Sequence, residues 1–253
     1  MALQYQHLVA LTDNRGIFEH ALYDTPRLEH GYCVDDVARA LIVLERNQPR
    51  ESEVFSLRNV YLDFLRSAQT PDGLFINRCD VNGNWNGPAE ATDHWGRGLW
   101  ALGTVHSYDS DWLISAEMLW RFEHGARHRS PFLRSMMFAG LGAAAVLRTT
   151  PMRQQARDLL RDAAEMVLGL MQARPDHPDW LWPEQSLTYA NAIIPEVLLL
   201  AGDLLEDSDY VELGLALLDW LLEQETSASQ FSVTPTTGHT FNQQRGIFDQ
   251  QSI

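Results

Sequence analysis

Residues 31–47 read GYCVDDVARALIVLERN, and this stretch decides the fold. Around a helix of 3.6 residues per turn, small or apolar side chains from residues 37–44 cover nearly the whole circumference. Helices of this kind are buried on several sides. Two acidic residues, Asp35 and Asp36, stand at the start of the stretch. The stretch therefore predicts a buried inner helix with carboxylates at its N-terminal end.

The same pattern returns along the chain, each time followed by an amphipathic stretch with Arg, Asp and Glu on one face. Such a face is typical of an outer helix that contacts solvent. The repeat of inner helix, outer helix and loop is about 40–60 residues long, which predicts stacked antiparallel helical hairpins in a solenoid or a closed toroid. We expect helices over residues 32–46, 52–69, 94–108, 110–128, 131–148, 151–173, 187–205 and 207–226.

Residues 73–86 break the helical pattern. Gly73 and Gly83 each precede short apolar and aromatic runs, and residues 80–82 between them read as a turn, which predicts a short β-hairpin. No linker divides the sequence, so we expect an all-α fold in which residues 1–253 form one α/α-toroid domain. Residues 248–251 resemble a further inner-helix start. The ring is therefore expected to be incomplete, and a missing C-terminal segment or a second copy of the chain would close it.

Composition excludes several classes of function. The chain has 34 acidic residues against 19 basic ones and a net charge of −15. This charge repels phosphate backbones and argues against a nucleic-acid partner. No apolar run approaches the roughly 20 residues that a membrane helix needs. The two cysteines are too few for a disulfide framework, and no signal peptide is evident, which favours a cytoplasmic protein.

Polar and aromatic residues gather in the loops that lead into the inner helices. If these helices run in the same direction, the residues meet at one end of the ring, where helix N-termini carry partial positive charge. We expect a pocket there. The candidate catalytic carboxylates are Asp36, Asp93, Glu184 and Asp35. The candidate substrate-binding residues are Tyr32, His94, Trp95, Arg97, Trp182, Tyr189, Asn191, Asp249 and Gln250.

Each of these residues also has a structural interpretation. An aspartate at a helix start usually caps the helix, and a tryptophan usually packs in a core. Two adjacent aspartates cannot both cap, however, because successive helical residues point about 100° apart. Paired carboxylates, aromatic rings and amides in one place favour glycoside chemistry. In an inverting mechanism the two carboxyl groups lie roughly 6.5–9.5 Å apart, and the sequence does not assign acid and base.

The sequence predicts no cofactor and no metal. Asp80, Asn82 and Asn84 resemble the start of a calcium loop, but Trp85 and Ala91 stand where such a loop needs glycine and glutamate. His124 and His128 lie within HGARH, which lacks the glutamate of a zinc protease. The small residues 140–145 match a nucleotide-binding pattern, but they lie within a predicted helix and indicate close helix packing.

Three segments carry a resemblance to known proteins: residues 11–21, residues 31–41 and residues 93–103, which read DHWGRGLWALG. They resemble a family of bacterial helical domains found with, or described as, glycosyltransferases. More broadly, the inner-helix pattern resembles the (α/α)6 toroid of six-hairpin glycosidase-like proteins. The resemblance implies a toroid whose central cavity is lined by Asp35, Asp36, Asp93, Arg97, Glu184 and Asp249.

The sequence departs from the family pattern in two respects. Val37 stands where an asparagine is expected, and the chain reaches eight or nine predicted helices where a full toroid has twelve. The leading hypothesis is a glycoside hydrolase that acts on an oligosaccharide or polysaccharide. The first alternative is a non-catalytic sugar-binding or scaffolding module of a glycosyltransferase system. The second is a terpene cyclase or prenyltransferase, suggested by residues 69–75, although the metal-binding DDxxD is missing because residues 35–39 read DDVAR.

Overall fold

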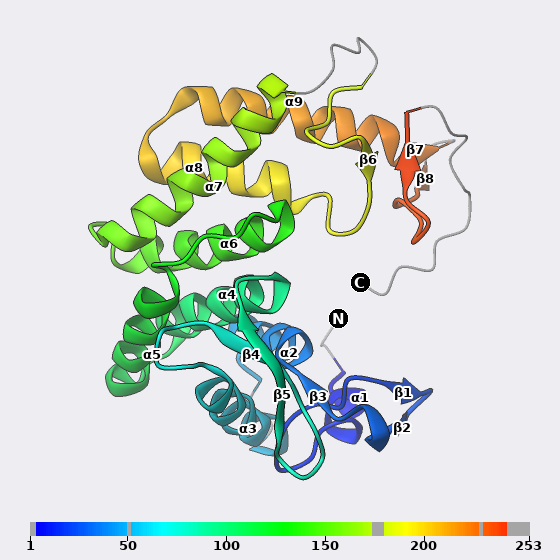
Figure 1. Ribbon diagram of the computed structural model, residues 1–253, viewed down its shortest axis with the longest axis vertical. Helices are drawn as coiled ribbons and strands as arrows, with labels where there is room; N and C mark the ends of the chain where they lie inside the picture. The colour runs from blue at the N-terminus through cyan, green and yellow to red at the C-terminus, as the bar shows by residue number, and fades with distance from the viewer. Residues whose placement is uncertain (1–3, 50–51, 174–179, 228–229, 242–253) are drawn as a thin grey trace. The chain divides into compact units, whose positions relative to one another are not determined.

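The computed structural model describes residues 4–49, 52–173, 180–227 and 230–241. Most of these residues are helical, and the strands are short and antiparallel (Figure 1), which confirms the predicted helical class. Contacts divide the chain into two compact units, Met1–Leu159 and Leu160–Ile253. The helices are α1 (Gln6–Ala10), η1 (Leu28–His30), α2 (Val34–Asn47), α3 (Ser52–Ala68), α4 (Asp93–Tyr108), α5 (Trp112–Gly125), α6 (Leu133–Thr149), α7 (Gln154–Ala173), α8 (Ile193–Leu205) and α9 (Ser208–Gln224).

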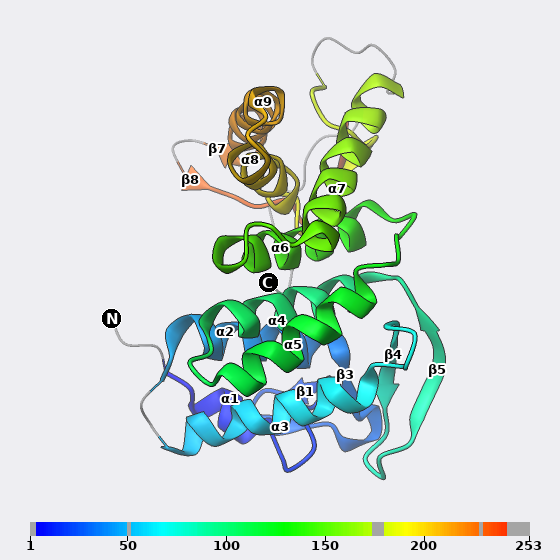
Figure 2. The same ribbon diagram turned by 90° about the vertical axis from the view of Figure 1, so that its left-hand side faces the viewer.

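The first unit is built on the inner helices α2, α4 and α6. Helix α4 packs between α2 and α6, while α3 packs on α2 and α5 packs on α4 (Figure 2). The inner helices run parallel, as shown by side-chain contacts that connect start to start and end to end. Near the starts of α2 and α4, Arg97 contacts Asp35, and at the far ends Arg58 bridges Glu45 and Asp109. The shared direction expected from the sequence therefore holds within this unit.

Helices α4 and α6 approach each other closely through glycine. A Cβ atom on Gly103 would lie 2.3 Å from the carbonyl oxygen of Gly142, and one on Gly96 would lie 2.3 Å from that of Ser135. These distances are too short for any larger residue, so the absence of side chains sets the spacing of the two helices. This confirms the prediction that residues 140–145 serve helix packing.

The predicted hairpin is present as β4 (Phe75–Cys79) and β5 (Trp85–Glu90), whose register pairs Cys79 with Trp85. The carboxylate of Asp80 closes the turn by accepting hydrogen bonds from the backbone N–H groups of Asn82 and Asn84. A further strand, β3 (Tyr32–Cys33), pairs with β4. The helix predicted from residue 32 therefore begins at Val34, because this long-range pairing draws residues 32 and 33 into the sheet. A separate small hairpin joins β1 (Ala21–Leu22) and β2 (Thr25–Pro26).

The second unit contains the packed pair α8 and α9 and short strands. Strand β6 (Ser186–Leu187) pairs with β9 (His239–Thr240), and β7 (Thr226–Ser227) pairs with β8 (Gln230–Phe231). The helix predicted from residue 187 begins only at Ile193. Leu187 is taken into β6, and a turn follows in which the Asn191 side chain bonds both backbone groups of Thr188.

Two expectations lie beyond these elements. The predicted fifth inner-helix start at residues 248–251, which includes Asp249 and Gln250, falls outside the described residues. The arrangement of the whole chain as a toroid stays a prediction. Within the described ranges, no helix combines the length and apolar character that crossing a bilayer requires.

Candidate functional site

The candidate site of the first unit is the cluster of polar side chains at the starts of α2, α4 and α6, here called the inner-helix cluster: Asp35, Asp36, Arg39, Asn77, Asp93, Arg97 and Ser135. These residues come from four elements, because Asn77 lies on β4. The fold brings them together because the inner helices are parallel and adjacent, so that their first turns meet. The sheet β3–β4–β5 lies at this end, since β3 leads into α2 and β4 contacts both α2 and α4.

Arg97 lies at the centre of the cluster. Its Nη1 donates a hydrogen bond to Oδ1 of Asp35 at 2.6 Å and lies 3.8 Å from Oδ2 of Asp93. Its guanidinium carbon lies 4.2 Å from the centroid of the Phe138 ring, an arrangement that a cation–π attraction stabilises. One arginine thus joins carboxylates from two inner helices and is oriented by a third helix.

Asp35 and Asp93 each have a further polar partner besides Arg97. The side-chain N–H of Asn77 donates to Oδ2 of Asp35 at 3.2 Å. The side-chain oxygen of Asn77, Oδ1, accepts a hydrogen bond from the backbone N–H of Val34. The Ser135 hydroxyl donates to Oδ1 of Asp93 at 2.7 Å. The side chains of Asp35 and Asp93 keep 20% and 26% of their surface exposed. The two carboxylates are therefore fixed in place while part of each remains open to solvent.

Asp36 points in a different direction from its neighbour Asp35. It forms an ion pair with Arg39, one turn further along α2, and accepts a hydrogen bond from the Cys33 thiol at 3.1 Å. Burial of Cys33, together with the negative charge of Asp36, raises the pKa of the Cys33 thiol far above its ordinary value. The thiol therefore keeps its proton and acts as a donor to Asp36.

Three residues predicted to bind substrate lie inside the first unit. Trp95 is fully buried, and its indole N–H donates to the carbonyl oxygen of Gly125 at 3.2 Å. The ring of His94 bonds Thr92 and the carbonyl oxygen of Phe75, so both of its nitrogens are occupied. Tyr32 is buried as well. These rings offer no face to a ligand in this structure, so the structural interpretation of Trp95, His94 and Tyr32 is the better one.

Tyr32 instead has a structural role, because it connects two segments beside the cluster. Its hydroxyl donates to Oδ2 of Asp13 at 2.6 Å, and its ring stacks on Phe18 with centroids 4.8 Å apart. Burial raises the pKa of Tyr32 well above its usual range, and the hydrogen bond to Asp13 is the second cause of this rise. The phenol is therefore a permanent donor that ties the turn at residues 13–16 to β3.

The remaining predicted residues belong to the second unit. Trp182 is fully buried and stacks on Trp220, with ring centroids 5.8 Å apart. Trp180 packs against Trp220 as well, and its indole donates to the backbone oxygen of Glu184. Tyr189 is 43% exposed, whereas Asn191 is buried in its turn. Within this unit, Glu184 is part-exposed and Tyr189 is open to solvent, and both stay candidates for substrate contact.

Sequence reasoning missed Asn77, Ser135 and Phe138. Ser135 had a detectable signal, because it is the third residue of its inner helix, as Asp36 is in α2. Asn77 had none, since its role depends on the pairing of β4 with β3. Among the residues that the structure describes, no group of three or more His, Cys, Asp or Glu side chains is arranged to hold a metal ion.

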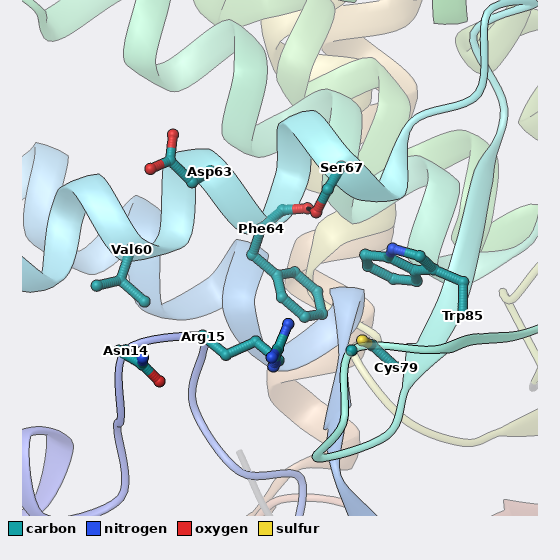
Figure 3. Close-up of a pocket in the computed structure, with 9 residues that line it drawn as sticks. Asn14, Arg15, Val60, Asp63, Phe64, Ser67, Cys79 and Trp85 are labelled. Atoms are coloured by element: carbon teal, nitrogen blue, oxygen red, sulfur yellow. Dashed lines mark hydrogen bonds between the residues drawn. The ribbon is translucent and has the colours of Figure 1, made fainter.

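A cavity of about 390 Å³ also opens in the first unit, near the same sheet (Figure 3). Its walls come from the turn at residues 13–16, from α3 and from the β4–β5 hairpin, and it shares no residue with the inner-helix cluster.

Comparison of the chain with models of known protein families gives no match, and comparison with curated protein sequences gives none either.

Proposed function

We propose that this chain is a carbohydrate-active domain, and that it acts as a glycoside hydrolase with the inner-helix cluster as part of its sugar-binding site. The observation that carries the proposal is the position of Arg97 between the carboxylates of Asp35 and Asp93. A guanidinium presents several fixed donors, and carboxylates accept hydrogen bonds from hydroxyl groups. A guanidinium between two carboxylates therefore suits a ligand with many hydroxyl groups, because each hydroxyl can both donate and accept a hydrogen bond.

Glycoside hydrolysis requires a carboxylic acid that protonates the leaving oxygen and a carboxylate that activates water or attacks the sugar. In this proposal Asp35 is a positioning residue, because it holds Arg97. Asp36, Asp93 and Glu184 are the candidates for the reacting carboxyl groups. Asp93 is favoured in the first unit because it is the more exposed carboxylate beside Arg97 and its contact with that arginine is the longer one.

The test is the release of reducing ends from a panel of oligosaccharides by the full chain and by Asp36→Asn, Asp93→Asn and Glu184→Gln. Loss of an acid or base should lower kcat by about 10²–10⁴-fold. The matched control is Glu117→Gln on outer helix α5, where the carboxylate pairs with Arg66 and Arg121. Hydrolysis that persists in all three variants at the control's rate would refute the assignment.

A non-catalytic sugar-binding module is the second candidate, and one observation favours it. Asp35 and Asp36 each already pair with an arginine, and Asp93 accepts a hydrogen bond from Ser135. Groups held in this way can bind hydroxyls without transferring protons. Calorimetry separates the two functions, because a binding module gives heat of binding with an oligosaccharide but releases no reducing ends, and Arg97→Lys weakens that binding.

A further inference from the structure

Arg15 lines the cavity of Figure 3 and has no counter-ion within the described part of the chain. The side chain of Arg15 forms no hydrogen bond or ion pair with any described residue. The local structure explains why the carboxylate of the same turn does not contact the guanidinium.

Both oxygens of Asp13, the nearest carboxylate in the sequence, accept hydrogen bonds from other groups. Oδ1 of Asp13 accepts hydrogen bonds from the backbone N–H groups of Arg15 and Gly16 at 2.8 and 3.2 Å. Its other oxygen accepts the hydroxyl of Tyr32 at 2.6 Å. Asp13 therefore fixes the backbone of the turn and leaves the side chain of Arg15 to extend into the cavity (Figure 3).

On the hairpin side of the cavity, no described carboxylate forms an ion pair with Arg15, and the carboxylate of Asp80 in the hairpin turn accepts hydrogen bonds from the backbone N–H groups of Asn82 and Asn84. Burial raises the pKa of the Cys79 thiol above its ordinary value, so this neighbour is neutral. The guanidinium lies against Gly83, where an added Cβ atom would come within 2.5 Å of Nη1 of Arg15. On the α3 side, Asp63 already pairs with Arg66. The charge of Arg15 is thus available to a ligand.

The cavity also offers a flat aromatic surface and neutral polar groups. Trp85 packs on Phe64 with ring centroids 4.9 Å apart, and its ring is only partly buried. Asn14 and Ser67 line the opening with an amide and a hydroxyl. Aromatic rings pack against the C–H faces of sugars, and amides and hydroxyls bond their hydroxyl groups. A volume of about 390 Å³ is enough for one small molecule.

We propose that this cavity binds an anionic monosaccharide, whose carboxylate or phosphate pairs with Arg15 while its ring packs on Trp85. Guanidinium groups match both anions through paired hydrogen bonds. The site is separate from the inner-helix cluster and does not depend on hydrolysis there. It would hold a charged sugar unit at the sheet, outside the inner helices.

Calorimetric titration of the full chain with glucuronate and with glucose 6-phosphate tests the proposal, and the two ligands distinguish the carboxylate from the phosphate. We expect at least one of them to bind 10-fold or more tightly than both glucose and inorganic phosphate. Arg15→Gln should weaken that binding at least 10-fold with an unchanged unfolding temperature, because among the described residues the Arg15 side chain has no hydrogen-bond or ion-pair partner to lose. Trp85→Leu should weaken it as well.

Arg78→Gln is the matched control, since Arg78 lies on the same sheet but pairs with Glu19 and does not line the cavity. Asp93→Asn should also leave this binding unchanged, so failure of the proposed hydrolase does not decide the matter. The proposal is overturned if neither anionic sugar binds, if glucose binds equally well, or if Arg15→Gln binds as the unaltered chain does.

Discussion

Arg97 of α4 donates a hydrogen bond to Asp35 of α2 at 2.6 Å, although the two residues are 62 positions apart in the chain. The contact joins the starts of two parallel inner helices, and Asn77 of β4 binds the same carboxylate from the sheet. Asp35 is therefore a junction between helix and sheet as well as part of the candidate site.

Replacement of Arg97 by Gln should destabilise the protein. It leaves the part-buried carboxylates of Asp35 and Asp93 near each other without the shared cation, which should cost about 1–3 kcal/mol in the free energy of unfolding. Urea denaturation followed by circular dichroism measures the effect. Arg66→Gln, which removes a more exposed arginine from the outer helices, should cost about 1 kcal/mol or less. Equal losses in the two variants would contradict the central role of Arg97.

Two glycine-to-alanine substitutions should have opposite effects. Gly103→Ala places a methyl group against the backbone of Gly142, so α4 and α6 must separate, which should cost about 1–3 kcal/mol. Gly169→Ala adds a methyl group on α7 where, apart from the neighbouring backbone of the helix itself, no atom of a described residue lies within 4 Å, and it should stabilise the helix by about 0.5–1 kcal/mol. Thermal unfolding of both variants checks the prediction. Tolerance of alanine at position 103 would show that the two helices are not held at the described spacing.

His106 should make stability depend on pH. Burial lowers the pKa of its imidazole from the ordinary value of 6.5, while Ser115 bonds Nδ1. The unfolded chain then binds a proton more readily than the folded one. The contribution of His106 is therefore complete above about pH 6.5 and is lost as the pH falls from there through the folded pKa.

The measurement for His106 is the urea midpoint at several values between pH 5 and pH 7.5. His106→Gln should flatten this profile relative to the unaltered chain, whatever its stability at neutral pH. His128→Gln is the control, because that histidine is part-exposed and its ring bonds the backbone oxygen of Asp72. If the urea midpoint of His106→Gln changes with pH as steeply as that of the unaltered chain, His106 is not the cause of the pH dependence.

The two thiols should be unreactive in the folded protein. Cys33 and Cys79 are both buried, and burial raises the pKa of each thiol. Thiolate is the reactive form, so a thiol reagent at pH 8 should modify neither residue until the chain unfolds. Both should react in denaturant. Rapid labelling of the native protein at either position would mean that the sheet β3–β4–β5 opens readily.

The sequence by itself determined most helix positions. The helix predicted over residues 52–69 is α3, Ser52–Ala68, and that over 94–108 is α4, Asp93–Tyr108. Apolar periodicity and helix-start signals act over a few residues, so they can be read from the chain directly. The hairpin at residues 73–86 is equally local, because its turn is closed by the side chain of Asp80.

The tertiary structure decided the rest. The start of α8 moved to Ile193 because Leu187 pairs with His239, a contact between segments that no local pattern connects. At the candidate site, the sequence indicated Asp35 and Asp93, but strand pairing supplied Asn77 as a partner of Asp35, and helix packing supplied Ser135 as a partner of Asp93. Packing also turned the ring of Trp95 inward. A period of 3.6 residues shows which face of a helix is apolar, but only its neighbours determine whether a large ring at the edge of that face meets solvent or the core.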